Sequence, residues 1–435
     1  MNDTIFAPSS AIGGAIAVIR ISGEEVRRVS ALLERDVFQT PRLMTHTRLM
    51  DGDEAVDDCM AVFFAVPNTY TGEDMVELNC HGGVETVRRI LELLGGLGFR
   101  PAQGGEFTRR AFLNGKMDLT QAEAVMDIIN ATAEQSRKAA MLQLQGSVSR
   151  EIHETEQLLL DALSGIDAAI DYPFEAEADA YAHLPDALGQ AIDRVDSLIR
   201  RGLRGRVLRE GLRVAILGRP NVGKSSLMNA LLGSERAIVT ANAGTTRDVL
   251  DEQTAFSGVP VRLMDTAGLR ETEDEAERIG VDRARATMGQ ADVLCLVLDG
   301  SAAVTGADKA LLRETEGTRR VILLNKSDLP EGAAWNGPDA LRVSARTGQG
   351  LDALRQRILE LAAPGDGECG CITNQRHIRA LTETLTDLRA ATETRELDCA
   401  ATDIRNALHE LGTITGTDVD GEVIDRIFAN FCVGK

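Results

Sequence analysis

The chain has 435 residues, which is enough for roughly three domains of ~150 residues each. Its 43% hydrophobic and 26% charged residues are typical of a folded globular protein, and no apolar run approaches the ~18 residues of a membrane span. The formal charge of −20 disfavours non-specific binding to nucleic acids. The opening MNDTIFAPSS lacks a secretory pattern, so we expect a cytoplasmic protein with reduced cysteines.

Residues 1–119 are predicted to form a small α+β domain. Short β-rich segments cover residues 15–21, 59–66 and 75–80, where apolar and β-branched side chains dominate. A helical pattern follows at residues 84–94. The combination of short strands and a helix indicates the α+β class.

Residues 120–210 are predicted to be all-α, because apolar side chains recur at helical spacing and no strand signal is present. We expect Pro173 to end one helix and a second helix to follow from about Leu184. This second helix carries an arginine series that continues to Arg213. The series is either a local basic patch for a nucleic acid or a solvated face that balances nearby acids.

Residues 211–363 alternate apolar strands with amphipathic helices, which predicts a parallel sheet covered by helices. Residues 364–435 begin with a Pro/Gly-rich linker and continue with helical patterns. The α/β block is therefore flanked by helical segments and is predicted to be inserted into one helical domain. The expected strands are residues 213–217, 261–264, 293–298, 321–324 and 341–343.

A phosphate-binding loop is predicted at residues 218–225, GRPNVGKS, which fit the pattern GxxxxGK[ST] between a strand and a helix. Glycines allow backbone N–H groups to surround phosphates, and the helix N-terminus adds its positive dipole end. Lys224 would reach the β- and γ-phosphates, and the Ser225 hydroxyl suits Mg²⁺.

Further segments at expected strand ends indicate a guanine nucleotide. Asp265-Thr266-Ala267-Gly268 offers a carboxylate on the metal side and a glycine near the γ-phosphate. Asn325-Lys326-Ser327-Asp328 offers an aspartate that can accept both N–H groups of the guanine edge, a donor pair that adenine lacks. Ser344-Ala345-Arg346 can support the base through backbone N–H groups. In this order the segments resemble the GTPase family.

The position directly after Asp265–Gly268 is occupied by Leu269, where many small GTPases have a glutamine that orients the attacking water. Another group must therefore orient this water. An acidic run at residues 271–277 follows, and it is either a solvated helix N-terminus or the source of that group. Upstream, Thr246 is the candidate to close over Mg²⁺ and the γ-phosphate.

Longer stretches resemble the tRNA-modifying GTPase family called MnmE or TrmE over essentially the whole chain. They include YTGEDMVELNCHGG, GEFTRRAFLNGKMDLTQAEAV, GRPNVGKSS, AGTTRD, DTAGLRETEDEAERIG and DRIFANFCVGK. The resemblance implies an N-terminal domain that binds tetrahydrofolate and mediates homodimerisation, then a helical domain with an inserted P-loop GTPase domain. It also implies a flavoprotein partner, MnmG, with which an aminomethyl-type group is placed on carbon 5 of wobble uridines in certain tRNAs.

The resemblance also assigns roles in the GTPase block. Glu277 matches the family's water-orienting glutamate, and Ser225 and Thr246 match Mg²⁺ ligands. The family's K⁺-binding residues are matched by Asn221, Thr240, Asn242 and Thr245. The resemblance implies that this K⁺ takes the place of an arginine finger. The expected GTP contacts are Asn221, Val222, Gly223, Lys224, Ser225, Ser226, Thr240, Ala241, Asn242, Ala243, Gly244, Thr245, Thr246, Asp265, Thr266, Ala267, Gly268, Asn325, Lys326, Asp328, Ser344, Ala345 and Arg346.

For the folate, a 5-formyl or methylene tetrahydrofolate, the resemblance assigns Arg20, Glu77, Lys116 and Lys435. A carboxylate such as Glu77 can pair twice with a pterin edge, and cations suit the acidic folate tail. Cys432 matches a family cysteine that is needed for modification. Read without the resemblance, each of these charged residues is an ordinary surface or paired charge.

Two hypotheses follow. The first is a GTPase component of a tRNA-modifying complex, and the second is a ribosome-assembly or regulatory GTPase switch without group-transfer chemistry. A ribosome-binding relative would be expected to carry a basic RNA-binding module after the GTPase block, whereas this chain has an acidic helical segment and the Cys-Val-Gly-Lys sequence.

Overall fold

The structure is a computed structural model that describes residues 3–233, 251–265, 289–332, 335, 337, 339–362, 372–394, 396–429 and 431–434. The chain divides into two compact units, and each is assembled from segments that are far apart in the sequence. Unit 1 consists of Met1–Met126, Ser149–His153 and Leu408–Lys435, and unit 2 of Asp127–Val148 and Glu154–Ala407. Among the described residues, no helix is long and apolar enough to cross a membrane.

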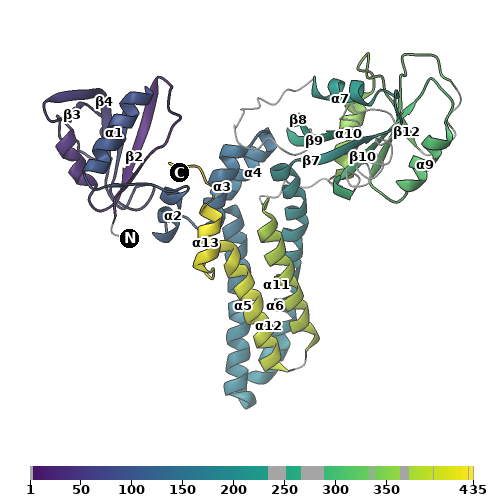
Figure 1. Cartoon of the computed structure of the whole chain (residues 1–435). Helices are drawn as coiled ribbons and strands as arrows, with labels where there is room; N and C mark the ends of the chain where they lie inside the picture. The colour runs from purple at the N-terminus through teal and green to yellow at the C-terminus, as the bar shows by residue number, and fades with distance from the viewer. Residues whose placement is uncertain are drawn as a thin grey trace. The chain divides into compact units, whose positions relative to one another are not determined.

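Unit 1 contains a six-stranded sheet with the order β3-β4-β5-β2-β1-β6, in which only the β1–β6 pair is parallel. Helix α1 (Val84–Gly96) covers one face of this sheet (Figure 1). Alternate strand residues such as Ile19 and Ile21 point to α1, where they pack with Val87 and Ile90. The strands are β1 (Ile5–Pro8), β2 (Ile16–Ser22), β3 (Thr45–Asp51), β4 (Glu54–Phe64), β5 (Met75–His81) and β6 (Arg100–Pro101).

The other face of this sheet is also partly covered. Phe6 of β1 belongs to the core under α1, whereas Ile5 and Ala7 pack with Phe107 of α2 (Glu106–Leu113). Strand β1 is therefore buried on both faces. A third apolar cluster joins the start of α3 (Leu119–Asn130) to α13 (Gly421–Phe428) through Leu119, Ala122, Ile424, Phe428 and Phe431.

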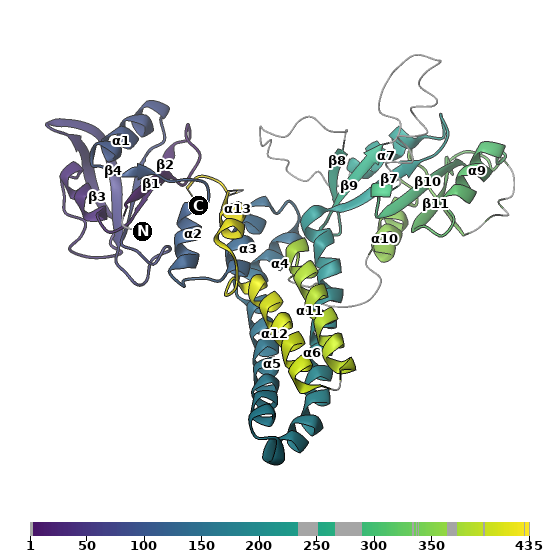
Figure 2. The same cartoon turned by 60° about the horizontal axis from the view of Figure 1, so that its bottom comes forward.

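The helical part of unit 2 contains α4 (Glu134–Leu144) and most of α5 (Ser147–Asp171), α6 (Pro173–Glu210), α11 (Gln375–Glu393) and α12 (Leu397–Thr415). Helices α6 and α11 run side by side in both views (Figures 1 and 2). A Cβ at Gly202 of α6 would lie 3.0 Å from Ile378 Cγ1 and 3.2 Å from Ile372 Cγ2, so glycine permits their close approach.

The predicted start of the second long helix at Leu184 is wrong. Helix α5 ends at Asp171 as expected, but α6 begins at Pro173 itself. Proline is tolerated in the first turn because the N–H groups there have no intrahelical acceptor in any case. The same residue therefore ends one helix and starts the next.

The second sheet has the order β12-β11-β10-β7-β9-β8 and is buried on both faces. The expected strands are present, but β8 was not expected and pairs antiparallel with β9, so the sheet is not fully parallel. Helices α7 (Lys224–Leu232), α9 (Gly306–Glu314) and α10 (Leu351–Ala362) accompany it. The strands are β7 (Leu212–Leu217), β8 (Asp251–Phe256), β9 (Val259–Asp265), β10 (Val293–Asp299), β11 (Arg320–Asn325) and β12 (Ala340–Arg342).

Candidate functional site

The loop between β7 and α7 has a backbone that requires its glycines. Gly218 and Gly223 have φ angles of 154° and 96°. A Cβ at Gly218 would lie 2.4 Å from the Val297 carbonyl oxygen, and a Cβ at Gly223 would lie 2.3 Å from Asn325 Nδ2. Side chains at these two positions are therefore excluded by space as well as by conformation.

The same loop carries the groups that a phosphate and a divalent metal need. Lys224 Nζ donates hydrogen bonds to the carbonyl oxygens of Gly218 at 2.8 Å and Arg219 at 3.0 Å, which keeps the ammonium over the loop. Ser225 is exposed in the first turn of α7, where backbone N–H groups have no intrahelical acceptor. Asp265 ends β9 and is the register partner of Ile216 of β7, so the backbone of β9 reaches the same sheet end as the loop.

Asn325, at the end of β11, joins the phosphate loop to the segment after β12. Its Nδ2 donates to the Val222 carbonyl oxygen at 2.9 Å, and its Oδ1 accepts from the Ala345 N–H at 3.1 Å. The amide is buried, and so is its hydrogen bond to Val222. This side chain therefore links three segments, of which the one at Val222 lies 103 residues before Asn325 in the sequence.

Asp328 lies beside the same segments with its carboxylate held by a neighbour. Ser344 Oγ donates to Asp328 Oδ1 at 2.7 Å, and the Arg346 guanidinium lies 4.0 Å from Oδ2. The hydrogen bond from Ser344, together with the charge of Arg346, lowers the pKa of Asp328 below its ordinary value. An ionised carboxylate in this position can accept two N–H donors from one edge of a base.

Several expected nucleotide contacts cannot be placed. The side chain of Asp265 and the whole of Thr240, Ala241, Asn242, Ala243, Gly244, Thr245, Thr246, Thr266, Ala267, Gly268 and Glu277 lie outside the described residues. Asn221, an expected K⁺ ligand, is described: it is exposed and has a φ angle of 65°. Ser226 is also exposed in α7.

In unit 1 the structure brings Arg20 and Glu77 together on the sheet face that α2 covers. They are register partners on β2 and β5, and Arg20 Nε and Nη2 donate to Glu77 Oε1 at 2.9 and 2.8 Å. The guanidinium lies 5.1 Å from the Tyr70 ring centre and 5.7 Å from that of Phe107. A cation, an anion and aromatic faces thus line one place, which suits a flat polar heterocycle.

Of the other expected folate contacts, Lys116 is described and Lys435 is not. Lys116 is exposed, and its Nζ donates to the Pro67 carbonyl oxygen at 2.9 Å. Lys435 lies outside the described residues. Burial raises the pKa of Tyr70 even though Thr108 hydrogen-bonds its hydroxyl, so this phenol stays neutral beside Arg20.

The segment around Cys432 is fixed to the N-terminal part of unit 1. Gly105 N–H donates to the Cys432 carbonyl oxygen at 3.2 Å, and Ser9 Oγ donates to the Gly434 carbonyl oxygen at 3.0 Å. Gly434 has a φ angle of 95°, and a Cβ there would lie 2.1 Å from the Pro8 carbonyl oxygen. The Cys432 side chain remains exposed. These contacts hold a thiol near β1, the strand next to the one that carries Arg20.

The same unit contains a buried ion network that was not predicted from the sequence. The Arg110 side chain is only 1% exposed and pairs with Asp3 at 2.7 Å, Glu73 at 3.1 Å and Glu106 at 3.2 Å. Ser22 Oγ donates to Glu73 at 2.8 Å. Glu106 and Arg110 are separated by one helical turn, and this spacing was the available signal.

The arginine series from Arg194 of α6 to Arg213 of β7 is largely paired with carboxylates. This favours the interpretation as a balanced face over a basic patch. The pairs are Arg194–Glu154 at 3.0 Å, Arg200–Asp196 at 2.5 Å, Arg206–Asp292 at 3.4 Å, Arg209–Asp127 at 2.9 Å and Arg213–Glu210 at 3.7 Å.

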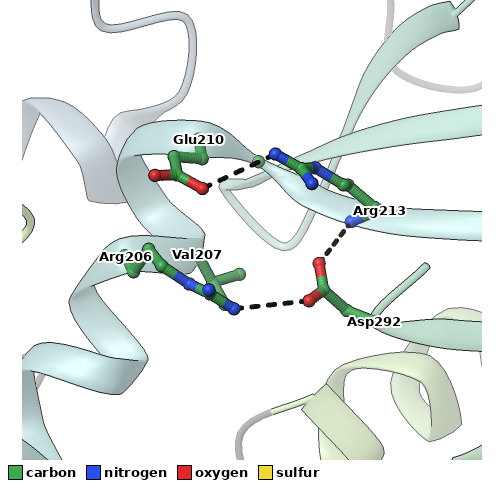
Figure 3. Close-up of a pocket in the computed structure, with 6 residues that line it drawn as sticks. Arg206, Val207, Glu210, Arg213 and Asp292 are labelled. Carbon is green, nitrogen blue, oxygen red and sulfur yellow. Dashed lines mark hydrogen bonds and ion pairs between the residues drawn. The ribbon is translucent and has the colours of Figure 1, made fainter. Parts of the chain in front are cut away.

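A small hollow lies where α6 meets β7 and β10 (Figure 3). Asp292 Oδ2 accepts from the Arg213 N–H at 3.0 Å, and Oδ1 faces Arg206. The hollow measures about 30 Å³, far below the roughly 300 Å³ that small ligand pockets occupy. It is therefore too small for a ligand, and its polar contacts connect α6 to the sheet.

The sheet order and the phosphate loop define a P-loop GTPase domain. Residues 4–116 match the family described as the GTP-binding protein TrmE N-terminus, and residues 119–432 match the MnmE helical domain. Two relatives named tRNA modification GTPase MnmE are similar over this whole chain and 98% of their own lengths. The protein of Lactobacillus helveticus is 39% identical over 453 residues, and that of Lactiplantibacillus plantarum is 41% identical over 460.

The chain belongs to the MnmE family of tRNA modification GTPases. This confirms the expected family and the three-part fold class: an α+β N-terminal domain, a helical domain and an inserted GTPase domain. Among solved structures, Era of Aquifex aeolicus bound to GDP·AlF₄⁻ matches 42% of this chain and 68% of its own, with 26% identity and a TM-score of 0.29.

Proposed function

We propose that this chain is a K⁺-activated GTP hydrolase that acts with the flavoprotein MnmG in the cytoplasm. Together they add an aminomethyl or carboxymethylaminomethyl group to carbon 5 of wobble uridine in certain tRNAs, and a tetrahydrofolate supplies the carbon. The protein acts as a homodimer through its N-terminal domains. The names of the relatives favour this function over a ribosome-assembly or regulatory switch.

The observation that carries this proposal is the arrangement within unit 1. The Arg20 guanidinium pairs with Glu77 and lies over the rings of Tyr70 and Phe107, and the segment with the exposed Cys432 is hydrogen-bonded to the same unit. A GTPase that served only as a switch would have no use for a heterocycle site. We assign Arg20, Glu77, Lys116 and Lys435 to the folate and Cys432 to the modification reaction.

In the GTPase domain we assign Lys224 to the β- and γ-phosphates, Ser225 and Thr246 to Mg²⁺, and Asn325 and Asp328 to the guanine. Asn325 also holds the phosphate loop in place, since it bridges Val222 and Ala345. Glu277 orients the attacking water in place of the absent glutamine. Bound K⁺, held by Asn221, Thr240, Asn242 and Thr245, would supply positive charge that stabilises the transition state.

The proposal is tested by GTP turnover in KCl and in NaCl at equal ionic strength. We expect turnover to be at least about tenfold faster in KCl, because removing one preorganised electrostatic group from such a site costs on the order of 10² in rate. Asn221→Ala should remove most of this difference, and Asp352→Asn, at a 99% exposed side chain of α10, should keep it. Equal rates in the two salts would contradict the K⁺ and Glu277 assignments.

A further inference from the structure

The turn that follows β10 holds a carboxylate in a fixed position. Asp299 ends the strand, and its Oδ1 accepts hydrogen bonds from the Ser301 N–H at 3.0 Å and from Ser301 Oγ at 2.6 Å. The Asp299 side chain is 13% exposed. The neighbouring strand β11 ends at Asn325, which is the register partner of Asp299 and bridges to the phosphate loop.

The other oxygen of this carboxylate faces Lys326. Lys326 Nζ donates to Asp299 Oδ2 at 2.7 Å. Burial alone would raise the pKa of Asp299, but Lys326 and Ser301 outweigh it and lower the pKa below its ordinary value. The carboxylate is therefore ionised and the pair is a charged hydrogen bond, which is stronger than a neutral one.

The backbone around the pair is also tightly packed. Gly300 N–H donates to the Asn325 carbonyl oxygen at 2.8 Å, and a Cβ at Gly300 would lie 2.9 Å from that oxygen. Lys326 itself has a φ angle of 66°, a left-handed conformation that a lysine adopts only when its surroundings impose it. Both ends of the lysine, backbone and ammonium, are thus held by the turn at Asp299–Ser301.

We propose that Asp299 is a positioning residue for guanine binding, which it serves by holding Lys326 extended along the wall of the base pocket. This inference rests on the proposed assignment of Asn325 and Asp328 to the guanine. A free lysine side chain loses rotamer freedom when a base packs on its stem, and a lysine that is already fixed does not. Asp299 therefore improves nucleotide affinity without touching the nucleotide.

The test is the affinity for GDP and the steady-state kinetics with GTP, measured in full-length protein. Asp299→Asn should raise the Kd for GDP and the KM for GTP by the same factor, about 3- to 10-fold, the cost of immobilising one long side chain. The kcat should stay within about twofold, because a contact to the base is equally strong in the ground and transition states. Ser301→Ala should act in the same direction and more weakly.

Two further variants separate positioning from a loss of fold or charge. Asp352→Asn removes the same charge from an exposed site and should leave the Kd unchanged. Lys326→Met should also weaken GDP binding, and the double variant with Asp299→Asn should be no weaker than Lys326→Met alone, because the two residues act as one unit. Additive losses, an unchanged Kd in Asp299→Asn, or a fall in its Tm and kcat together would each overturn the proposal.

The guanine assignment has its own test in Asp328→Asn. An asparagine amide can donate a hydrogen bond to the second carbonyl of xanthine. This variant should therefore bind xanthosine diphosphate more tightly than guanosine diphosphate. If this change of preference occurs while Asp299→Asn binds GDP normally, the guanine site stands and the role of Asp299 does not. If Asp328→Asn still prefers guanosine diphosphate, the assignment of Asp328 to the guanine and the role of Asp299 are both overturned.

Discussion

At the scale of the single residue, Arg110 is the largest fully buried side chain among the described residues. It is a buried cation that faces three carboxylates, Asp3, Glu73 and Glu106. Arg110→Met should destabilise unit 1 by about 3–5 kcal/mol, because it removes the cation paired with Glu73 and leaves Asp3 and Glu106 with Arg100 alone. Arg88→Met removes an exposed arginine of α1 and should have little effect. Urea denaturation of both variants, followed by circular dichroism, measures the difference.

The same network predicts how stability depends on pH. Burial raises the pKa of Glu106, but hydrogen bonds from Arg100 and the Gln103 N–H outweigh it and lower the pKa below the ordinary value of 4.5. Arg100 and Arg110 likewise lower the pKa of Asp3. Carboxylates with a lowered folded-state pKa stabilise the protein above their unfolded pKa values, and this stability disappears as the pH falls through the folded values.

We therefore expect the free energy of unfolding to be level near neutral pH and to fall below about pH 4.5. In Arg110→Met this dependence on pH should be weaker, since the pKa values of Asp3 and Glu106 would lie nearer to their ordinary values. Urea titrations at a series of pH values give the two slopes. An equally steep fall in both proteins would contradict the role given to Arg110.

At the scale of the element, the contact between α6 and α11 depends on one small residue. A side chain at Gly202 would meet Ile378 and Ile372, whereas a Cβ at Gly189 of the same helix would meet nothing within 4 Å. Gly202→Leu should therefore destabilise unit 2 by about 1–3 kcal/mol through overpacking. Gly189→Leu, the matched control, should stabilise it by about 0.5–1 kcal/mol through helix propensity. Thermal melts that rank the two variants otherwise would contradict this contact.

The elements also show how far sequence patterns reach. The strands of the second sheet could be predicted because their apolar runs are long and buried on both faces, as in β10. Strand β8, with the sequence DEQTAF, lies at an edge and has too little apolar character to be recognised. Pro173 misled the prediction because proline forbids the interior of a helix but suits its first turn.

Site residues could be predicted where they form one short motif, but not where they depend on contacts between distant parts of the sequence. The phosphate loop and Asn325–Asp328 could be predicted because each is a short contiguous segment with fixed chemistry. The pairing of Arg20 with Glu77, and the burial of Arg110, depend on strand register and on contacts between residues far apart in the sequence. Charge alone does not distinguish these residues from the many exposed ones.

At the scale of the whole molecule, the segment at Cys432 is joined to unit 1, whereas the phosphate loop belongs to unit 2. Deleting Phe431–Lys435 should therefore leave GTP turnover nearly intact and abolish tRNA modification. Gly434→Val keeps the length but places a side chain against the Pro8 carbonyl oxygen, so it should reduce modification strongly. Val433→Ala, at a 59% exposed position, should not. Modification that persists in the deletion variant would refute the role assigned to Cys432.

The interleaving of the two units also has a consequence for synthesis. Unit 1 needs both Met1–Met126 and Leu408–Lys435, and the second segment is translated on the order of 280 residues after the first. At about 5–20 residues per second, Leu119 and Ala122 wait roughly 15 to 60 seconds for Phe428 and Phe431, which complete their apolar cluster. We expect a nascent chain that stops within unit 2 to leave the apolar side chains around Leu119 exposed, where chaperones and proteases bind them.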